Sequence, residues 1–234
     1  MIKITNVSVM NFENAIRGMR NPLNSWEKSD SNVCPNGDGF EDCKISCDQC
    51  PRVDDPRWSE PVFCMGANDL ALAMRLANAG SDDRKFLRQI FVSIDIEAPL
   101  YWWKEMDQYK VGTVTNSCST MHRIHSRDLE LSDFSHEHLD APGKMLLEAT
   151  IDYLNFNRKR FVETKDKSYW LHMIQMLPTS YNQLRTFTAN YEVLKNIYHA
   201  RRHHKLGEWH TLCDEIEKMP YSQLIIGGRD ERGE

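Results

Sequence analysis

The chain has 234 residues, of which 41% are hydrophobic and 27% are charged, and its formal net charge is −5. This composition is typical of a soluble globular protein, and the negative balance argues against a general nucleic-acid coat protein. No apolar run approaches the roughly 20 residues that a membrane helix needs. We therefore expect residues 1–234 to form a single cytoplasmic domain that binds neither nucleic acid nor membrane.

The first elements predicted along the chain are a strand, a polar loop and a helix. Residues 1–12 alternate in part between apolar and polar side chains, which indicates a strand. Residues 21–65 begin with a stretch rich in Asn, Asp, Ser, Pro and Gly, and we expect a cysteine-containing insertion or loop there. Asn68 or Asp69 can then cap a helix that ends at Gly80.

The middle of the chain predicts a strand followed by an aromatic helix. Residues 86–96 mix β-branched and aromatic side chains and favour a central strand. Ala98-Pro99 is a suitable start for a helix that ends before Gly112. Residues 113–124 are polar and β-branched, which indicates an extended loop or a short strand.

The last part of the chain is mostly helical by pattern. Amphipathic or apolar spacing predicts helices and one strand in this region. The helices span residues 145–161, 169–176, 190–204 and 208–218, and the strand spans residues 183–189. The acidic tail, residues 227–234, is predicted to be disordered.

The helix predicted over residues 190–204 carries basic residues in its apolar face. Successive helical residues turn by about 100°, which gives a stripe of Val193, Leu194, Ile197 and Ala200. Asn190, Arg201 and His204 fall inside this stripe, whereas polar residues such as Glu192 and Lys195 fall on the opposite side.

A guanidinium in an apolar face needs a partner, because an unpaired buried charge is very costly. That partner is either a ligand anion, which Arg can grip with two parallel hydrogen bonds, or a protein carboxylate such as Asp214 or Glu217. The run of basic and titratable residues 201–205 favours the anion, because these side chains repel one another unless something negative is near. We therefore predict an anion-binding site between Asn190 and Trp209.

Most of the seven cysteines lie in the polar loop, and their odd number fits reduced thiols. Four of them have spacings that can hold a tetrahedral Zn²⁺ ion, the alternative being free thiols. These are Cys34, Cys43, Cys47 and Cys50. The last three also have the C-x3-C-x2-C spacing of radical S-adenosylmethionine enzymes, but the alternating βα pattern of those enzymes is absent.

Two segments resemble the flavin-dependent thymidylate synthases, and the first begins with the strand FVSIDI followed by Ala98-Pro99. The family then carries the signature Arg-His-Arg-x-x-Ser-x-Asn-Glu-x-Ser-x-Arg-Tyr. Aligned without a gap, the Arg-His-Arg, Ser, Asn and Glu places are taken by Gln108, Tyr109, Lys110, Thr113, Thr115 and Asn116. A shift by one residue instead pairs Asn116 and Ser119 with the family's Asn and second Ser.

The second segment resembles the C-terminal half of the same family. Leu177-Pro178 precedes a strand, and a helix then carries Asn190 and, eleven residues later, Arg201. Trp209 follows with one extra residue before it. In the family this Asn contacts FAD, and the Arg holds and polarises the pyrimidine of dUMP. Asn196 also matches a family Asn near the flavin.

The sequence departs from the family at three places. Only Lys110 of the Arg-His-Arg equivalents is basic. The family's Arg before Leu-Pro is replaced by Ile174 or Gln175. The second Arg of the family's Asn-x-Arg pair is Glu192.

The resemblance implies an α+β fold with a central, mainly antiparallel sheet flanked by helices. It implies one-carbon transfer from methylenetetrahydrofolate to C5 of a dUMP-like nucleotide, with FAD reduced by NADPH, in a homotetramer. Arg201 would be catalytic and would bind substrate, with Arg202 as the alternative and Arg185 for the phosphate. Asn116 and Ser119 would also bind substrate. The implied FAD-binding residues are Asn190, Asn196, Lys110, Tyr109, Gln108 and Thr113.

Three functions remain open from the sequence. The first is this flavin-dependent reaction or a variant such as hydroxymethylation. The second is a non-catalytic nucleotide-binding protein on the same fold, which the incomplete Arg-His-Arg signature motivates. The third is an interaction module in which the cysteine loop binds metal.

Overall fold

The computed structural model describes residues 2–34 and 62–227. The chain divides into two compact units, which are described separately. Unit 1 comprises Met1–Val7, Ser93–Thr188 and Lys205–Thr211, and unit 2 comprises Ser8–Val92, Ala189–His204 and Leu212–Glu234. Predictions for Cys43, Cys47, Cys50 and the tail 228–234 fall outside the described residues.

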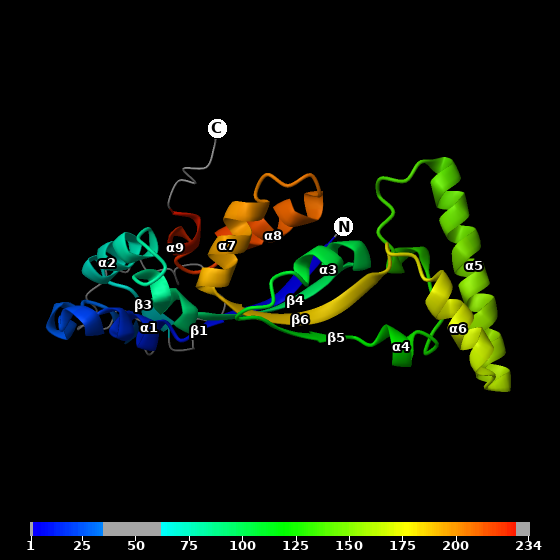
Figure 1. The fold of residues 1–234 in the computed structure, drawn as a ribbon, viewed down its shortest axis with the longest axis horizontal. Coiled ribbons are helices and arrows are strands. Elements are labelled where there is room, and N and C mark those ends of the chain that lie inside the picture. The colour runs from blue at the N-terminus through cyan, green and yellow to red at the C-terminus, as the bar shows by residue number, and fades with distance from the viewer. Residues whose placement is uncertain (1, 35–61, 228–234) are drawn as a thin grey trace. The chain divides into compact units, whose positions relative to one another are not determined.

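A four-stranded sheet has the order β1-β4-β6-β5 (Figure 1). Its strands are β1 (Lys3–Met10), β4 (Phe91–Pro99), β6 (Asn182–Asn190) and β5 (Val114–Ser117). β5 pairs antiparallel with β6, and Ser117 stands opposite Arg185 in the register. The predicted α+β class, with an antiparallel sheet flanked by helices, is confirmed.

In unit 1 the helix α3 (Leu100–Met106) packs on the sheet through buried tryptophans. Trp103 donates its indole N–H to the backbone carbonyl of Gln183 on β6 at 2.9 Å. The side chain of Trp102 lies against the ring of Trp209, with 4.8 Å between ring centroids. The aromatic residues of α3 therefore form core contacts with β6 and with the start of α8.

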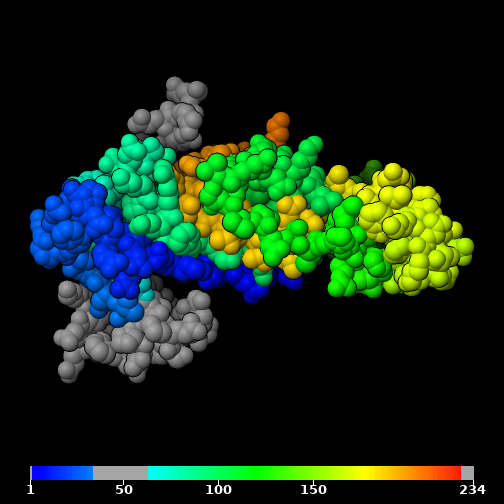
Figure 2. All heavy atoms as spheres, turned by 60° about the horizontal axis from the view of Figure 1, so that its bottom comes forward, coloured from blue at the N-terminus to red at the C-terminus, as the bar shows by residue number. Residues whose placement is uncertain are grey.

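A second part of unit 1 is helical and has its own apolar core. The elements are α4 (Thr120–Arg123), η5 (Leu131–Asp133), α5 (Ala141–Thr164) and α6 (Lys167–Met176). α4 lies beside the pair of α5 and α6 (Figures 1 and 2). The buried side chains that join them are Ile124, Leu129, Phe134, Leu147, Ile151, Leu154 and Met173.

Unit 2 contains short helices and a two-stranded ribbon. β2 (Asn32–Cys34) pairs antiparallel with β3 (Val62–Cys64). The other elements are α1 (Phe12–Met19), η1 (Asn21–Leu23), η2 (Trp26–Lys28), α2 (Ala67–Ala77), η4 (Arg84–Gln89), α7 (Tyr191–Arg201) and α9 (Gln223–Ile226). α8 (Gly207–Glu217) spans the boundary between the units.

A buried ion pair fixes the start of this ribbon. Arg20 Nε donates to Asp69 Oδ1 at 2.5 Å, and both side chains are almost fully enclosed. The other carboxylate oxygen of Asp69 accepts from the hydroxyls of Ser29 and Ser31. Asp30 in turn accepts from the first backbone N–H groups of α2. These bonds attach residues 29–31 to the N-terminus of α2.

Several predicted element bounds were wrong. The first strand ends at Met10, within the predicted residues 1–12, and the helix α1 after it, which buries Phe12, Ala15, Ile16 and Met19, was not predicted. Residues 84–89 form a 3-10 helix rather than the beginning of the strand. Ala98-Pro99 ends β4 instead of starting the next helix.

Among the helices that the structure describes, none has an apolar stretch long enough to span a bilayer.

Candidate functional site

Asn190 does not lie in the helical stripe that the wheel predicted. It is the last residue of β6 and the N-cap of α7, with an extended backbone. Its Oδ1 accepts a hydrogen bond from the backbone N–H of Val193 at 3.0 Å, as expected for an Asn cap. Its Nδ2 makes no hydrogen bond with the described residues, so this largely buried amide keeps an unused donor.

The predicted polar side of this helix was also wrong. Glu192 and Lys195 are buried, whereas Ala200, which was placed in the apolar stripe, is exposed. The burial of Glu192 alone would raise its pKa, but hydrogen bonds from Arg88 and Arg84 of η4 lower the pKa below its usual value. Non-local partners therefore decide which face of α7 is covered.

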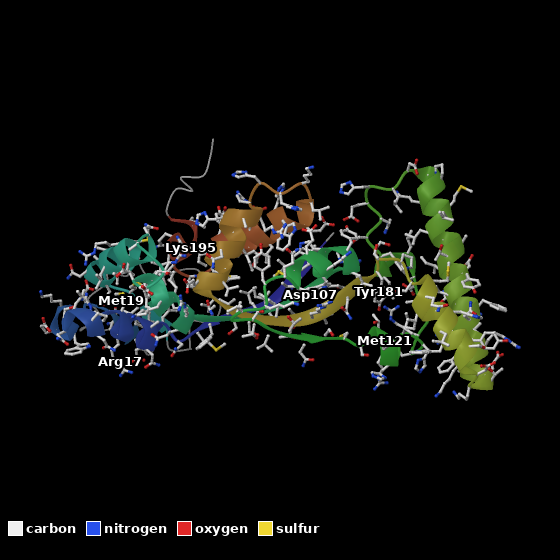
Figure 3. The ribbon with its side chains drawn as sticks, viewed as in Figure 1. Arg17, Met19, Asp107, Met121, Tyr181 and Lys195 are labelled. Carbon is white, nitrogen blue, oxygen red and sulfur yellow. The ribbon has the colours of Figure 1, made fainter. Side chains whose placement is uncertain are left out.

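Lys195, labelled in Figure 3, projects from α7 toward the C-terminal helix. Its Nζ donates to the backbone carbonyls of Ile225 and Gly227. Burial, together with the nearby charge of Arg84, lowers the pKa of Lys195 to about 8. This lysine therefore holds α9 against α7.

The two arginines at the end of α7 differ in their surroundings. Arg202 donates to Asp214 Oδ1 at 2.7 Å and lies 3.2 Å from Glu217 Oε1. Asp214 and Glu217, the carboxylates considered as structural partners on this segment, thus pair with Arg202. Arg201 is the last residue of α7 and is half-buried, and Asn196 is exposed one and a half turns earlier.

The turn between α3 and β5 carries the positions aligned with the family signature. Gln108 and Lys110 are exposed, and the ring of Tyr109 lies edge-on to Trp209 with 6.2 Å between centroids. The hydroxyl of Thr113 donates to the backbone carbonyl of Tyr109 and closes the turn. The turn therefore presents an amide, a phenol and one cation, rather than two guanidinium groups.

Asn116 and Ser119 lie on β5 and just after it. Asn116 is paired with Thr186, so it lies on the opposite sheet face from Arg185, whose register partner is Ser117. The hydroxyl of Ser119 caps α4 by accepting from the backbone N–H of His122 at 3.0 Å. Ser117 therefore shares a sheet face with Arg185 and stands directly opposite it.

Arg185 lies on the inner strand β6, and its side chain is only 14% exposed. Its guanidinium carbon lies 4.3 Å from the centroid of the Trp103 ring. Its Nε donates to Gln183 Oε1 at 2.8 Å, and its Nη1 donates to Asp107 Oδ1 at 2.9 Å. The guanidinium is therefore oriented by groups from β6 and from the C-terminal end of α3.

The candidate residues fall into two groups, one in each unit. Unit 1 contains Gln108, Tyr109, Lys110, Thr113, Asn116, Ser119 and Arg185, and unit 2 contains Asn190, Asn196, Arg201 and Arg202. Sequence reasoning missed Trp103, Gln183 and Asp107 as neighbours of Arg185. Gln183 is two residues from Arg185 on the same strand, so the sequence alone indicates that the two side chains share a sheet face. The contacts with α3 join residues distant in sequence and could not be predicted in this way.

In residues 2–34 and 62–227, no group of three or more His, Cys, Asp or Glu side chains is arranged to hold a metal ion. Three of the four predicted zinc ligands, Cys43, Cys47 and Cys50, lie outside this range. Cys64 and Cys213 are buried, and burial raises the pKa of the Cys213 thiol to about 11. Cys213 is therefore held as a neutral thiol at physiological pH.

No family model matches the sequence, and none of the curated proteins matches it. Solved structures do match the fold. Thymidylate synthase X from Helicobacter pylori, crystallised with FAD and dUMP, is 14% identical with a TM-score of 0.63, and the match covers 96% of each chain. The UMP/dUMP methylase PolB from Streptomyces cacaoi, bound with 5-Br dUMP, is 11% identical with a TM-score of 0.53, covering 93% of this chain and 88% of PolB. The chain therefore has the fold of thymidylate synthase X.

Proposed function

We propose that this protein is an enzyme that transfers a one-carbon unit to C5 of a uracil nucleotide 5′-monophosphate. The observation that carries the proposal is the extent of the fold match, 96% of both chains, with a structure that holds dUMP and FAD. Arg201, eleven residues after the cap Asn190, is the residue proposed to contact the pyrimidine.

The proposed role of Arg201 is electrostatic. As C5 becomes nucleophilic, negative charge spreads onto the carbonyl oxygens of the uracil ring, and a fixed guanidinium stabilises this charge. The carbon comes from methylenetetrahydrofolate, and C5 loses its proton once the new bond has formed. Arg201, at the end of a rigid helix, would hold the ring in place while this occurs.

FAD is the cofactor that the fold implies, and one observation supports its fit. Asn190 has an unused Nδ2 donor at the start of α7, which suits a carbonyl or phosphate oxygen of a dinucleotide. Asn196 is exposed on the same helix and offers a further donor. Bound FAD, reduced by NADPH, would supply the hydride that converts the transferred carbon into a methyl group.

The visible spectrum of the purified protein tests the flavin, with and without added FAD. We expect an absorbance band of bound flavin that survives gel filtration. Incubation with dUMP, methylenetetrahydrofolate and NADPH, followed by mass spectrometry of the nucleotide, distinguishes methylated from hydroxymethylated product. Arg201→Met should abolish product, whereas the exposed His203→Ala, on the same segment, should retain it.

A second candidate is a nucleotide-binding protein without catalysis. The replacement of Arg-His-Arg by Gln108, Tyr109 and Lys110 favours it, because two guanidinium groups are absent from the turn. A rise in melting temperature with dUMP and none with FAD would support this candidate. A colourless protein that takes up no FAD and forms no product would reject the enzymatic proposal.

We also propose that the protein is a homo-oligomer, with a tetramer as the expected state. Large apolar side chains are exposed on α5, and adjacent exposed apolar patches commonly mark interfaces. They include Met145, Leu146, Tyr153 and Phe156, with Leu146 exposed to 71%. Light scattering coupled to gel filtration gives the mass. A monomer at micromolar concentration would contradict this part of the proposal.

A further inference from the structure

The guanidinium of Arg185 is held on three sides, and two of these sides are rigid. Trp103, which lies under the guanidinium, is buried and fixed by its hydrogen bond to β6. Gln183 is also buried, and its Nε2 donates to the backbone carbonyl of Cys118 at 2.8 Å. This bond orients the amide so that Oε1 accepts from Arg185. Two of the three groups that hold the guanidinium are therefore uncharged and fixed by their own hydrogen bonds.

The third side is different. Asp107, labelled in Figure 3, is 52% exposed, whereas the side chain of Arg185 is 14% exposed. A single hydrogen bond joins them, from Nη1 to Oδ1. Among the described residues, Nη2 of Arg185 and Oδ2 of Asp107 have no hydrogen-bond partner. The pair thus lacks the two parallel bonds of a full Arg–carboxylate fork.

The position of Asp107 does not favour a stabilising role. Asp107 is the C-cap of α3, and a carboxylate is disfavoured at the negative end of a helix. An ion pair with one exposed partner also contributes little to stability. The structure nevertheless places this carboxylate against a guanidinium that is already oriented. This arrangement is expected if the carboxylate of Asp107 leaves Arg185 when a ligand binds.

We propose that the carboxylate of Asp107 is an exchangeable anion, which pairs with Arg185 until the phosphate group of a phosphate monoester ligand displaces it. This inference rests on the proposed function only for the identity of the nucleotide. A phosphate monoester can accept from Nη1 and Nη2 together, so it uses the donor that Asp107 leaves free. Ser117, opposite Arg185 in the register, offers a hydroxyl on the same sheet face.

The exchange makes binding selective for a phosphorylated ligand. A neutral nucleoside brings no charge to replace the carboxylate, so Asp107 stays on Arg185. A dianionic phosphate displaces it, and the carboxylate then moves into solvent, which its exposure allows. Asp107 is thus a residue that determines specificity, while Arg185 is the residue that contacts phosphate.

Calorimetric titration of the full chain with inorganic phosphate, dUMP and deoxyuridine tests this assignment. Asp107→Asn removes the competing charge and keeps the shape, so phosphate and dUMP should bind about fivefold tighter. The affinity for deoxyuridine should stay unchanged. Arg185→Met should abolish the binding of inorganic phosphate. Asp128→Asn is the matched control, because Asp128 forms a similar half-exposed pair with Arg158 at 2.8 Å in the same unit.

The outcomes separate this inference from the proposed function. If Asp107→Asn leaves phosphate and dUMP affinities within about twofold of wild type, or weakens them, the exchange is rejected. If Asp128→Asn tightens binding equally, the effect is one of overall charge, and the exchange is also rejected. If dUMP binds no variant but Asp107→Asn tightens inorganic phosphate, the phosphate site stands and the uracil nucleotide assignment fails.

Discussion

Two Arg–Asp pairs in this protein have the same chemistry and different surroundings. Arg20 and Asp69 in unit 2 are 4% and 0% exposed, and Asp69 also accepts from Ser29 and Ser31. Arg185 and Asp107 in unit 1 share one bond, and the carboxylate is half exposed. A carboxylate that is enclosed and fully hydrogen-bonded cannot leave its arginine, whereas an exposed one with a free oxygen can. The first pair is therefore structural, and the second is available for function.

The largest effect is expected at the enclosed pair. Burial alone would raise the pKa of Asp69, but hydrogen bonds from Ser31, Ser29 and Arg20 lower it, so Asp69 is ionised in the folded state. Asp69→Asn leaves Arg20 as a buried charge without its counter-ion, and the free energy of unfolding should fall by about 3–5 kcal/mol. Urea denaturation at pH 7 measures this loss.

The control for Asp69→Asn is Asp152→Asn, because Asp152 is exposed on α5. This substitution should change the free energy of unfolding by less than about 0.5 kcal/mol. A loss below about 1 kcal/mol for Asp69→Asn would place the buried pair in the same class as the exposed one. The contrast between the two pairs would then have no basis.

Lys195 extends the comparison to a buried cation whose hydrogen-bond partners are carbonyls. Folded Lys195 loses its proton near pH 8, whereas the unfolded chain keeps that proton up to its usual pKa of 10.5. The unfolded state therefore binds more protons in this window, and the contribution of Lys195 to the free energy of unfolding rises with pH.

The difference in unfolding free energy between wild type and Lys195→Met should accordingly grow in favour of wild type by on the order of 2 kcal/mol between pH 8 and 10.5. Denaturation curves across this range measure it. The exposed Lys144→Met, on α5, is the control variant for these curves. A difference that is flat with pH would mean that burial leaves Lys195 unperturbed.

Arg202 is an intermediate case. Its partners Asp214 and Glu217 are both more than one-third exposed, so Arg202→Ala should lower the free energy of unfolding by only about 0.5–1 kcal/mol. Because the guanidinium is engaged by these carboxylates, dUMP affinity should fall less than in Arg201→Met. If Arg202→Ala abolishes dUMP binding and Arg201→Met does not, the roles of the two arginines must be exchanged.

The smallest effect on stability is expected at the exposed pair. Asp107→Asn removes one exposed ion pair and also one unfavourable charge at the end of α3, so the free energy of unfolding should change by less than about 0.5 kcal/mol. Urea denaturation of Asp107→Asn and Asp69→Asn under the same conditions compares their losses in unfolding free energy directly. A loss of more than about 2 kcal/mol would show that Asp107 is a structural partner of Arg185.

The sequence predicted the elements whose signals are local. α5, α6, β6 and α8 were found within a few residues because their periodicity and caps are encoded nearby. The buried side of α7 was not predicted, because Glu192 and Lys195 are covered by η4 and by the chain end, which are distant in sequence. Periodicity alone cannot identify a polar residue that a distant partner neutralises.

The same limit applies to the candidate site. Arg201 and Asn190 were selected from their spacing, and the structure adds that Asn190 is a helix cap. Arg185 was assigned to the phosphate through the resemblance, and the sequence gives no sign that Trp103 lies under its guanidinium. The organisation of a basic residue by aromatic and amide neighbours depends on tertiary contacts, and only the structure provides these.

The central claim is that this fold binds a uracil nucleotide through Arg201. Titration calorimetry with dUMP on wild type and Arg201→Met tests it most directly, with His203→Ala as control. We predict saturable binding of dUMP by wild type and His203→Ala, and a loss of about 100-fold in affinity for Arg201→Met. Equal dUMP affinity in wild type and Arg201→Met, or no dUMP binding by wild type, would contradict the claim.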